Sequence, residues 1–279
     1  MNELSFLNGR FIGMNKILQG DCSDVLKTLP SDSVDYIIFS PPYDSIRKYK
    51  GFSPFDKTKR EAICKELLRV AKDGAACSVI IQDQTVDGAK TGTSMRVAVE
   101  WMDLGWNLFE TTIYKRHGPP GVFWKRRFRV DHEYVHTFFK GDKVKHFNKD
   151  HMLIPSKHAG KIVSCDKRHA GGETEEGKDF LCPDMKCLGT VWEYASSNRE
   201  GNKVKMQHPA TFPDKLAGDL IRCFTVEQDL VLDCMAGSGT SCVMAKKYKR
   251  NYIGIEFSEE YVEIIKSRFE NEISDDVFE

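Results

Sequence analysis

Apolar and polar positions alternate along this chain in blocks that predict an α/β fold. Short apolar runs bounded by polar residues are typical of buried strands, and three stand out at Val34–Phe39, 230–232 and 252–255. Residues 61–71 place apolar side chains at near-helical spacing between charges, and Gly74 follows as a predicted helix stop. A further apolar run, 75–81, predicts the next strand. This alternation of strand and helix favours a sheet covered by helices over a β-sandwich.

The C-terminal part of the chain has the same alternation around a glycine-rich turn. We predict a helix at Asp214–Phe224, a strand, the turn, a helix at 240–248, a second strand and a terminal helix at 259–270. Residues 141–189 differ, because they are polar and rich in Lys, His and Gly. The prediction is one α/β domain formed by residues 1–140 and 190–279, with an insertion at 141–189 that carries recognition loops.

Composition adds three constraints. The 279 residues carry 41 basic and 41 acidic side chains, so an anionic partner has to be met by a local patch of charge. No stretch reaches the ~18 consecutive apolar residues of a membrane span, and the N-terminus lacks the order of a signal peptide, so we expect a cytoplasmic protein without a membrane partner. Nine cysteines in a long chain favour reduced thiols over a disulfide framework.

The glycine-rich turn, residues 233–240, predicts a nucleotide-like ligand. Its glycines allow a tight turn and close approach of the backbone to a ligand. Glu256 ends the next strand, where a carboxylate can accept hydrogen bonds from both ribose hydroxyls. Asp233 at the start of the turn would repel a pyrophosphate but suits a cationic cofactor without phosphate, such as S-adenosylmethionine. A nicotinamide or flavin site is the competing interpretation, although Cys242 replaces its usual third small residue.

A second motif, Ser40-Pro41-Pro42-Tyr43, follows the strand Val34–Phe39. Two successive prolines make the backbone rigid and leave carbonyl oxygens as acceptors. Ser40 adds an acceptor and Tyr43 a flat ring, so the segment suits a planar group that bears an NH2, such as a nucleobase. A strand-ending turn with a buried aromatic ring is the structural alternative.

These motifs, with Gly20-Asp21-Cys22 before them and the segment 208–213 between them, resemble the β-class amino-group DNA methyltransferases. In that class the catalytic motif precedes the cofactor motif, as it does here. The resemblance spans the chain outside the insertion. It implies a Rossmann-like methyltransferase fold with a mostly parallel sheet and helices on both faces, S-adenosylmethionine as methyl donor, double-stranded DNA as substrate and a base flipped out of the helix.

The resemblance also implies a role for particular residues. Asp21 would meet the donor's adenine, Glu256 its ribose, and Asp233 its methionine end. The catalytic residues would be Ser40, Pro41, Pro42 and Tyr43. The cofactor-binding residues would be Asp21, Cys22, Thr211, Phe212, Asp233, Met235, Ala236, Gly237, Ser238, Gly239, Thr240, Glu256 and Phe257. Cys234 and Met235 stand where the family commonly has Pro-Phe, so its aromatic wall is missing or is supplied elsewhere.

A basic stretch between Thr111 and Val130 holds six Lys or Arg and no acidic residue, which favours contact with DNA phosphates over an ordinary solvated face. The residues are Lys115, Arg116, Lys125, Arg126, Arg127 and Arg129. Aromatic residues interleaved with them either stack on a base or pack in the core. A zinc site made of Cys165, His169, Cys182 and Cys187 is disfavoured, because its spacing is loose for a structural site. No metal is expected.

The most detailed prediction concerns which base is methylated. Carbon-5 methylation of cytosine needs a cysteine nucleophile, typically in a Pro-Cys pair, and none of the ten prolines is followed by Cys. Ser at the first motif position is associated with cytosine-N4 methylation in the family, so this is preferred over adenine-N6. An NAD-dependent oxidoreductase and a DNA-binding module without catalysis stay as more distant alternatives. A cognate restriction endonuclease and a homodimer are open as partners, and the source would be bacterial, archaeal or phage.

Overall fold

The computed structural model describes residues 5–7, 10–42, 55–117, 128, 130–164, 167–168, 172–175, 177–195 and 211–273. Two compact units divide the chain: Met1–Asn148 with Thr190–Glu279, and Lys149–Gly189. In the described part of the chain no helix is long and apolar enough to cross a membrane.

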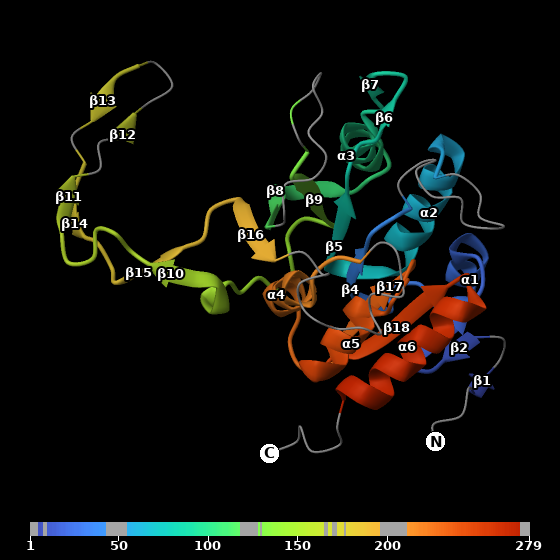
Figure 1. The fold of residues 1–279 in the computed structure, drawn as a ribbon. Coiled ribbons are helices and arrows are strands. Elements are labelled where there is room, and N and C mark those ends of the chain that lie inside the picture. The colour runs from blue at the N-terminus through green and yellow to red at the C-terminus, as the bar shows by residue number, and fades with distance from the viewer. Residues whose placement is uncertain are drawn as a thin grey trace. The chain divides into compact units, whose positions relative to one another are not determined.

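The larger unit is built on an eight-stranded sheet with the order β16-β8-β9-β5-β4-β17-β18-β3 (Figure 1). Its strands are β3 (Lys16–Gln19), β4 (Val34–Phe39), β5 (Ala71–Ile81), β8 (Asn107–His117), β9 (His132–Phe139), β16 (Val191–Ala195), β17 (Leu230–Asp233) and β18 (Asn251–Glu256). Among these described strands, only β9 runs antiparallel to its neighbours, β5 and β8. The prediction of a mostly parallel sheet is confirmed.

Within the described residues, six helices belong to this unit: α1 (Cys22–Thr28), α2 (Lys57–Val70), α3 (Thr93–Asp103), α4 (Asp214–Phe224), α5 (Thr240–Lys247) and α6 (Glu259–Glu272). The blue-to-teal helices α1, α2 and α3 contact one another in sequence, and so do the orange-to-red helices α4, α5 and α6 (Figure 1). Connections between parallel strands are right-handed as a rule. Those from β4 to β5 and from β17 to β18 run in opposite directions along the sheet. The two sets of helices therefore cover opposite faces. The expected Rossmann-like architecture is confirmed.

Strand β4 is buried at all six positions, because helices cover both sides of the sheet. Asp35 is the charged exception. Its carboxylate accepts hydrogen bonds from Lys72 Nζ at 2.7 Å, Lys145 Nζ at 3.0 Å and the backbone N–H of Leu230 at 3.0 Å. Burial alone raises the pKa of Asp35, but these hydrogen bonds lower it below its ordinary value. The buried carboxylate thus joins β4 to β17.

The first predicted helix differs from the structure at both ends. Helix α2 begins at Lys57, because Asp56 caps it by accepting from the N–H of Lys59 at 2.9 Å. It ends at Val70, and β5 starts at the next residue. Gly74 is therefore not the helix stop. It lies inside β5 at φ 75°, beside an irregularity in the β4–β5 pairing, and a Cβ there would come within 2.9 Å of the Lys145 backbone nitrogen.

The smaller unit is a ladder of short antiparallel pairs. After the 3-10 turn Asp150–Met152, β10 (Leu153–Pro155) pairs with β15 (Met185–Cys187), β11 (Ile162–Ser164) with β14 (Asp179–Leu181), and β12 (Lys167–Arg168) with β13 (Thr174–Glu175). This nesting makes one two-stranded arm. Two further hairpins, β1 (Ser5–Leu7) with β2 (Arg10–Ile12) and β6 (Thr85–Val86) with β7 (Ala89–Lys90), belong to the larger unit.

Candidate active site

Predicted site residues lie at the ends of four strands that are neighbours in the sheet. Strand β4 pairs in parallel with β17, β17 with β18, and β18 with β3. Parallel neighbours end at the same edge, so the segments after Phe39, Asp233, Glu256 and Gln19 all leave the sheet there. The chain proceeds from β4 toward β5 but from β17 toward β18, which makes this the switch point where open α/β sheets bind ligands.

The glycine-rich loop after β17 is organised by Asp233. Its side chain is almost completely buried and accepts hydrogen bonds from the N–H of Met235 at 3.0 Å and from the hydroxyl of Ser241. Burial, with a smaller contribution from Glu256, raises the pKa of Asp233 to about 7. The carboxyl group therefore ties the start of the loop to helix α5.

Glu256 holds the middle of the same loop. One carboxylate oxygen accepts from the N–H of Gly237 at 2.7 Å and the other from the N–H of Ser258 at 2.8 Å. Burial raises the pKa of Glu256 above its ordinary value. Gly239 follows at φ 75° and caps α5, a conformation that favours glycine. The remaining predicted loop residues, Met235, Ala236, Ser238 and Thr240, lie in this loop or begin α5, and Phe257 lies just beyond β18.

The proposed catalytic segment begins next to this loop. Ile37 of β4 is paired with Leu232 of β17. Asp233 is the last residue of β17, and Ser40 is the first residue after β4. The two motifs therefore leave the sheet at the ends of adjacent strands. Pro41 is buried, and Ser40 and Pro42 are half-buried. Tyr43 lies outside the described residues.

Asp21 lies at the same edge, after β3. Gly20 donates its N–H to the backbone oxygen of Glu256 at 2.9 Å, which places Asp21 next in the chain at the cap of α1. One Asp21 oxygen accepts from the N–H of Ser23 at 2.8 Å and the other from Lys59 Nζ at 3.0 Å. Burial raises the pKa of Asp21, but these partners lower it overall. Cys22 is buried at the start of α1, and burial raises the pKa of its thiol to about 11.

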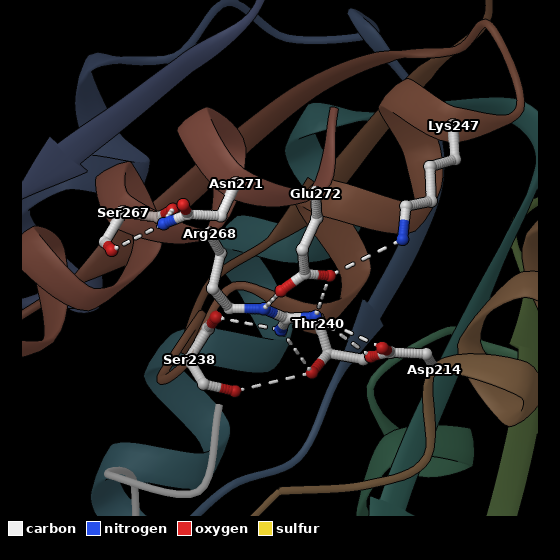
Figure 2. A network of polar contacts seen from close by, with 8 residues as sticks. All are labelled: Asp214, Ser238, Thr240, Lys247, Ser267, Arg268, Asn271 and Glu272. Atoms are coloured by element: carbon white, nitrogen blue, oxygen red, sulfur yellow. Dashed lines mark hydrogen bonds and ion pairs between the residues drawn. The ribbon is translucent and has the colours of Figure 1, made fainter. Parts of the chain in front are cut away.

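Thr211 and Phe212 precede helix α4 and are half-buried. The first residue of that helix, Asp214, forms an ion pair with Arg268 of α6 at 3.2 Å. Arg268 also donates to the backbone oxygen of Ser238 at 3.0 Å (Figure 2). The 211–213 segment and the glycine-rich loop are therefore linked through one side chain.

Comparisons with known proteins agree with this arrangement. A family model described as DNA methylase, named for N6 and N4 methyltransferases, matches residues 34–267. The orphan methyltransferase M.BamHII of Bacillus amyloliquefaciens is 33% identical over 262 residues, which cover 91% of each chain. The type II methyltransferase M1.MboII of Moraxella bovis is 31% identical over 269 residues, covering 89% of this chain and 94% of that protein. The chain belongs to the DNA methylase family.

Solved structures with the same fold include two methylases. The PvuII DNA methyltransferase, described as cytosine-N4-specific, has a TM-score of 0.66 at 22% identity, covering 93% of this chain and 88% of that one. A DNA modification methylase of Thermus thermophilus, solved with S-adenosyl-L-methionine, has a TM-score of 0.65 at 20% identity, covering 93% and 95%. At this identity the likeness shows the fold alone.

Family membership confirms the resemblance predicted from the motifs and the DNA methyltransferase function. The methyl donor of this DNA methylase is S-adenosylmethionine, as predicted. The donor set in the structure fits that cofactor, because Asp233, Glu256 and Asp21 place three carboxylates at one sheet edge beside a glycine turn. Membership of this family replaces the two alternatives, an NAD-dependent oxidoreductase and a DNA-binding module without catalysis. The contacts assigned to individual residues stay predictions.

The basic stretch is less uniform than its sequence indicates. Lys115 forms an ion pair with Glu193 at 2.6 Å, and Arg116 contacts Glu133 at 3.5 Å. These two side chains thus lie beside acidic groups that partly balance their charge. Lys125, Arg126, Arg127 and Arg129 lie outside the described residues, and Phe128 is 97% exposed. Binding of DNA by this stretch stays a prediction.

Within the described ranges no cluster of three or more His, Cys, Asp or Glu could hold a metal ion. Of the four residues considered for zinc, Cys182 is half-buried and Cys187 exposed, while Cys165 and His169 lie outside the described residues. The residues that sequence analysis missed are Lys59 and Arg268. Each reaches a predicted cofactor segment from a distant helix, and no local pattern signals such a partner.

Proposed function

We propose that this DNA methylase transfers the methyl group of S-adenosylmethionine to the N4 nitrogen of a cytosine. The observation that carries the proposal is the parallel pairing of β4 with β17, because it puts Ser40-Pro41-Pro42 beside the glycine-rich loop at the switch point of the sheet. The donor would occupy the loop side and the base the proline side.

The reaction is a direct displacement without a covalent enzyme intermediate. The lone pair of an exocyclic amine is delocalised into the base, so the nitrogen is a poor nucleophile. When its two hydrogens are donated to Ser40 Oγ and the carbonyl oxygen of Pro41, the nitrogen becomes more tetrahedral and its lone pair attacks the methyl carbon. As the N–C bond forms, the C–S bond of the donor would break to leave a neutral thioether, and the methylated amine would release one proton to solvent. Alignment of two bound reactants contributes up to roughly 7–11 kcal/mol.

The base has to leave the duplex to reach this edge, at a cost of a few kcal/mol. Stacking on Tyr43 offsets about 1–3 kcal/mol of it. Cytosine is preferred over adenine because the motif begins with Ser rather than Asp. Both bases offer the same NH2 group, so adenine-N6 is the second candidate.

The smaller unit, Lys149–Gly189, is proposed as the target-recognition element. A two-stranded β-ribbon has the dimensions that enter the major groove, and the nested pairs β10–β15, β11–β14 and β12–β13 form such a ribbon. The unit holds seven Lys or Arg and seven Asp or Glu, so its net charge is zero. Contact with phosphates would therefore fall to individual exposed lysines, among them Lys161 and Lys186. A companion restriction endonuclease and a homodimer stay predictions.

The test is nucleoside analysis of DNA after incubation with methyl-labelled donor. The expected product is N4-methylcytosine. N6-methyladenine would overturn the choice of base, and the absence of any methylated nucleoside would overturn the function.

Ser40→Ala is expected to lower kcat by about 100-fold or more while donor affinity stays unchanged. Ser33→Ala is the matched control, because Ser33 precedes the same strand at its opposite end and its hydroxyl donates locally to the backbone oxygen of Pro30.

A further inference from the structure

Arg268 of helix α6 is completely buried, although it carries a charge that is never lost in proteins. All five N–H donors of its guanidinium have acceptors. Nε and one Nη2 hydrogen meet the two oxygens of Glu272 at 2.7 and 3.1 Å, and the other Nη2 hydrogen faces both oxygens of Asp214 at 3.2 Å. Nη1 donates to the backbone oxygen of Ser238 at 3.0 Å and to the hydroxyl of Thr240 at 3.1 Å.

These acceptors come from three different parts of the chain, as Figure 2 shows. Glu272 lies one turn further along α6 and contacts Lys247 at 3.4 Å. Asp214 begins α4, directly after the 211–213 segment. Ser238 and Thr240 belong to the glycine-rich loop and the start of α5. One side chain therefore connects both segments assigned to the methyl donor and anchors them to α6.

The backbone around Gly239 shows that α6 supports the loop closely. A Cβ on Gly239 would come within 2.8 Å of the Ile265 side chain, one turn before Arg268. Asp233 and Glu256 hold the first half of the loop, and Arg268 holds the second half. A lysine could not replace it, because an ammonium has three donors at one point and lacks the planar fork that reaches acceptors on opposite sides.

We propose that Arg268 is a positioning residue for the methyl donor: it orders the second half of the glycine-rich loop and the 211–213 segment before S-adenosylmethionine binds. This inference rests on the proposed donor site. A loop that is already ordered loses less conformational freedom on binding, so affinity is higher. Arg268 has no role in the chemical step, because its donors are all taken by protein groups.

The test compares Arg268→Lys with Glu272→Gln, using calorimetry with S-adenosylmethionine and steady-state methylation of DNA. Arg268→Lys loses the hydrogen bonds to the loop and is expected to weaken donor affinity by about tenfold or more, with kcat at saturating donor nearly unchanged. Glu272→Gln keeps those hydrogen bonds and loses only charge within α6. Its melting temperature should fall while its donor affinity stays within about twofold of wild type.

Hydrogen exchange of the backbone amides at 238–241 measures the local order of the loop separately from the overall stability of the protein. Arg268→Lys should speed their exchange at a temperature well below unfolding, and Glu272→Gln should not. Should Arg268→Lys fail to fold, Asp214→Asn replaces it, because it weakens the link to the 211–213 segment. It is then expected to bind the donor more weakly than Glu272→Gln does.

Three outcomes would contradict the proposed role of Arg268, and the first of them would also contradict the proposed function. If wild-type protein binds no S-adenosylmethionine, both the proposed function and the role of Arg268 are wrong. If wild type binds and Glu256→Gln weakens binding, but Arg268→Lys binds like wild type, only the role of Arg268 is wrong. If Asp214→Asn or Arg268→Lys weakens donor binding no more than Glu272→Gln, the arginine is a structural ion-pair centre and the inference is overturned.

Discussion

At the scale of single residues, Asp233 combines almost complete burial with a pKa raised to about 7 by that burial. The unfolded chain binds this proton only below about pH 4. The native state therefore holds the proton more tightly, and the stability that this proton contributes is complete below about pH 4 and is lost as the pH rises through about 7. A cationic donor favours the ionised carboxylate, so binding changes with pH in the opposite direction.

We expect donor affinity to rise between about pH 6 and about pH 8 while the free energy of unfolding of the unliganded protein falls between about pH 4 and about pH 7. Calorimetry with S-adenosylmethionine and urea unfolding at several pH values measure the two trends. Asp233→Asn cannot ionise, so it should flatten both profiles. Equal pH profiles for wild type and Asp233→Asn would show that another group is responsible.

At the scale of elements, the contact between α5 and β18 explains why Cys242 replaces the third glycine of a dinucleotide fingerprint. That glycine normally allows a helix to approach a strand closely. Here the space is provided by the strand: a Cβ on Gly254 would come within 2.8 Å of Cys242 Sγ and within 2.8 Å of Ile17 Cδ1. The small residue at this contact is thus Gly254 of β18 rather than a residue of α5, and the helix still packs closely against the strand.

Gly254→Ala should therefore lower the free energy of unfolding by about 1–3 kcal/mol through overpacking. Urea denaturation measures this loss. The matched control is Gly189→Ala, where an added Cβ has no heavy atom within 4 Å and φ is not left-handed. A Gly254→Ala protein as stable as the control would mean that β18 and α5 can separate at no cost.

At the scale of the whole molecule, the two compact units divide the work in our proposal: the larger unit binds the donor and the smaller one reads DNA. The double variant Lys161→Glu with Lys186→Glu should weaken DNA binding by about tenfold. The dependence of affinity on salt should become less steep by about 0.9 for each phosphate that is no longer neutralised. Donor affinity should not change, because these lysines belong to the other unit.

Fluorescence anisotropy of labelled duplex at several salt concentrations measures the effect. The control double variant, Lys27→Glu with Lys266→Glu, makes the same change in net charge with exposed lysines of the larger unit. If the two double variants lose the same affinity, the loss reflects only the net charge of the whole protein and the recognition role is wrong.

The sequence by itself determined the elements with strong local patterns and the chemistry of the motifs. Val34–Phe39 and Asp214–Phe224 were predicted with their observed bounds, because apolar runs and helical spacing depend on neighbouring residues alone. The order of the motifs was enough to indicate the family. Helices α1 and α3 were not predicted, and the predicted start of α2 was too late, because Asp56 acts as its cap through geometry that spacing does not specify.

Only the tertiary structure decided which distant segments meet. The order of strands joined Asp35 to Leu230 across 195 residues and so brought the proline motif next to the glycine-rich loop. It also supplied Lys59 for Asp21, Arg268 for the loop and Glu193 for Lys115. Such partners follow from crossover direction and packing between elements. A buried charge needs a hydrogen-bonding or oppositely charged partner, but the order of residues along the chain does not say which element supplies it.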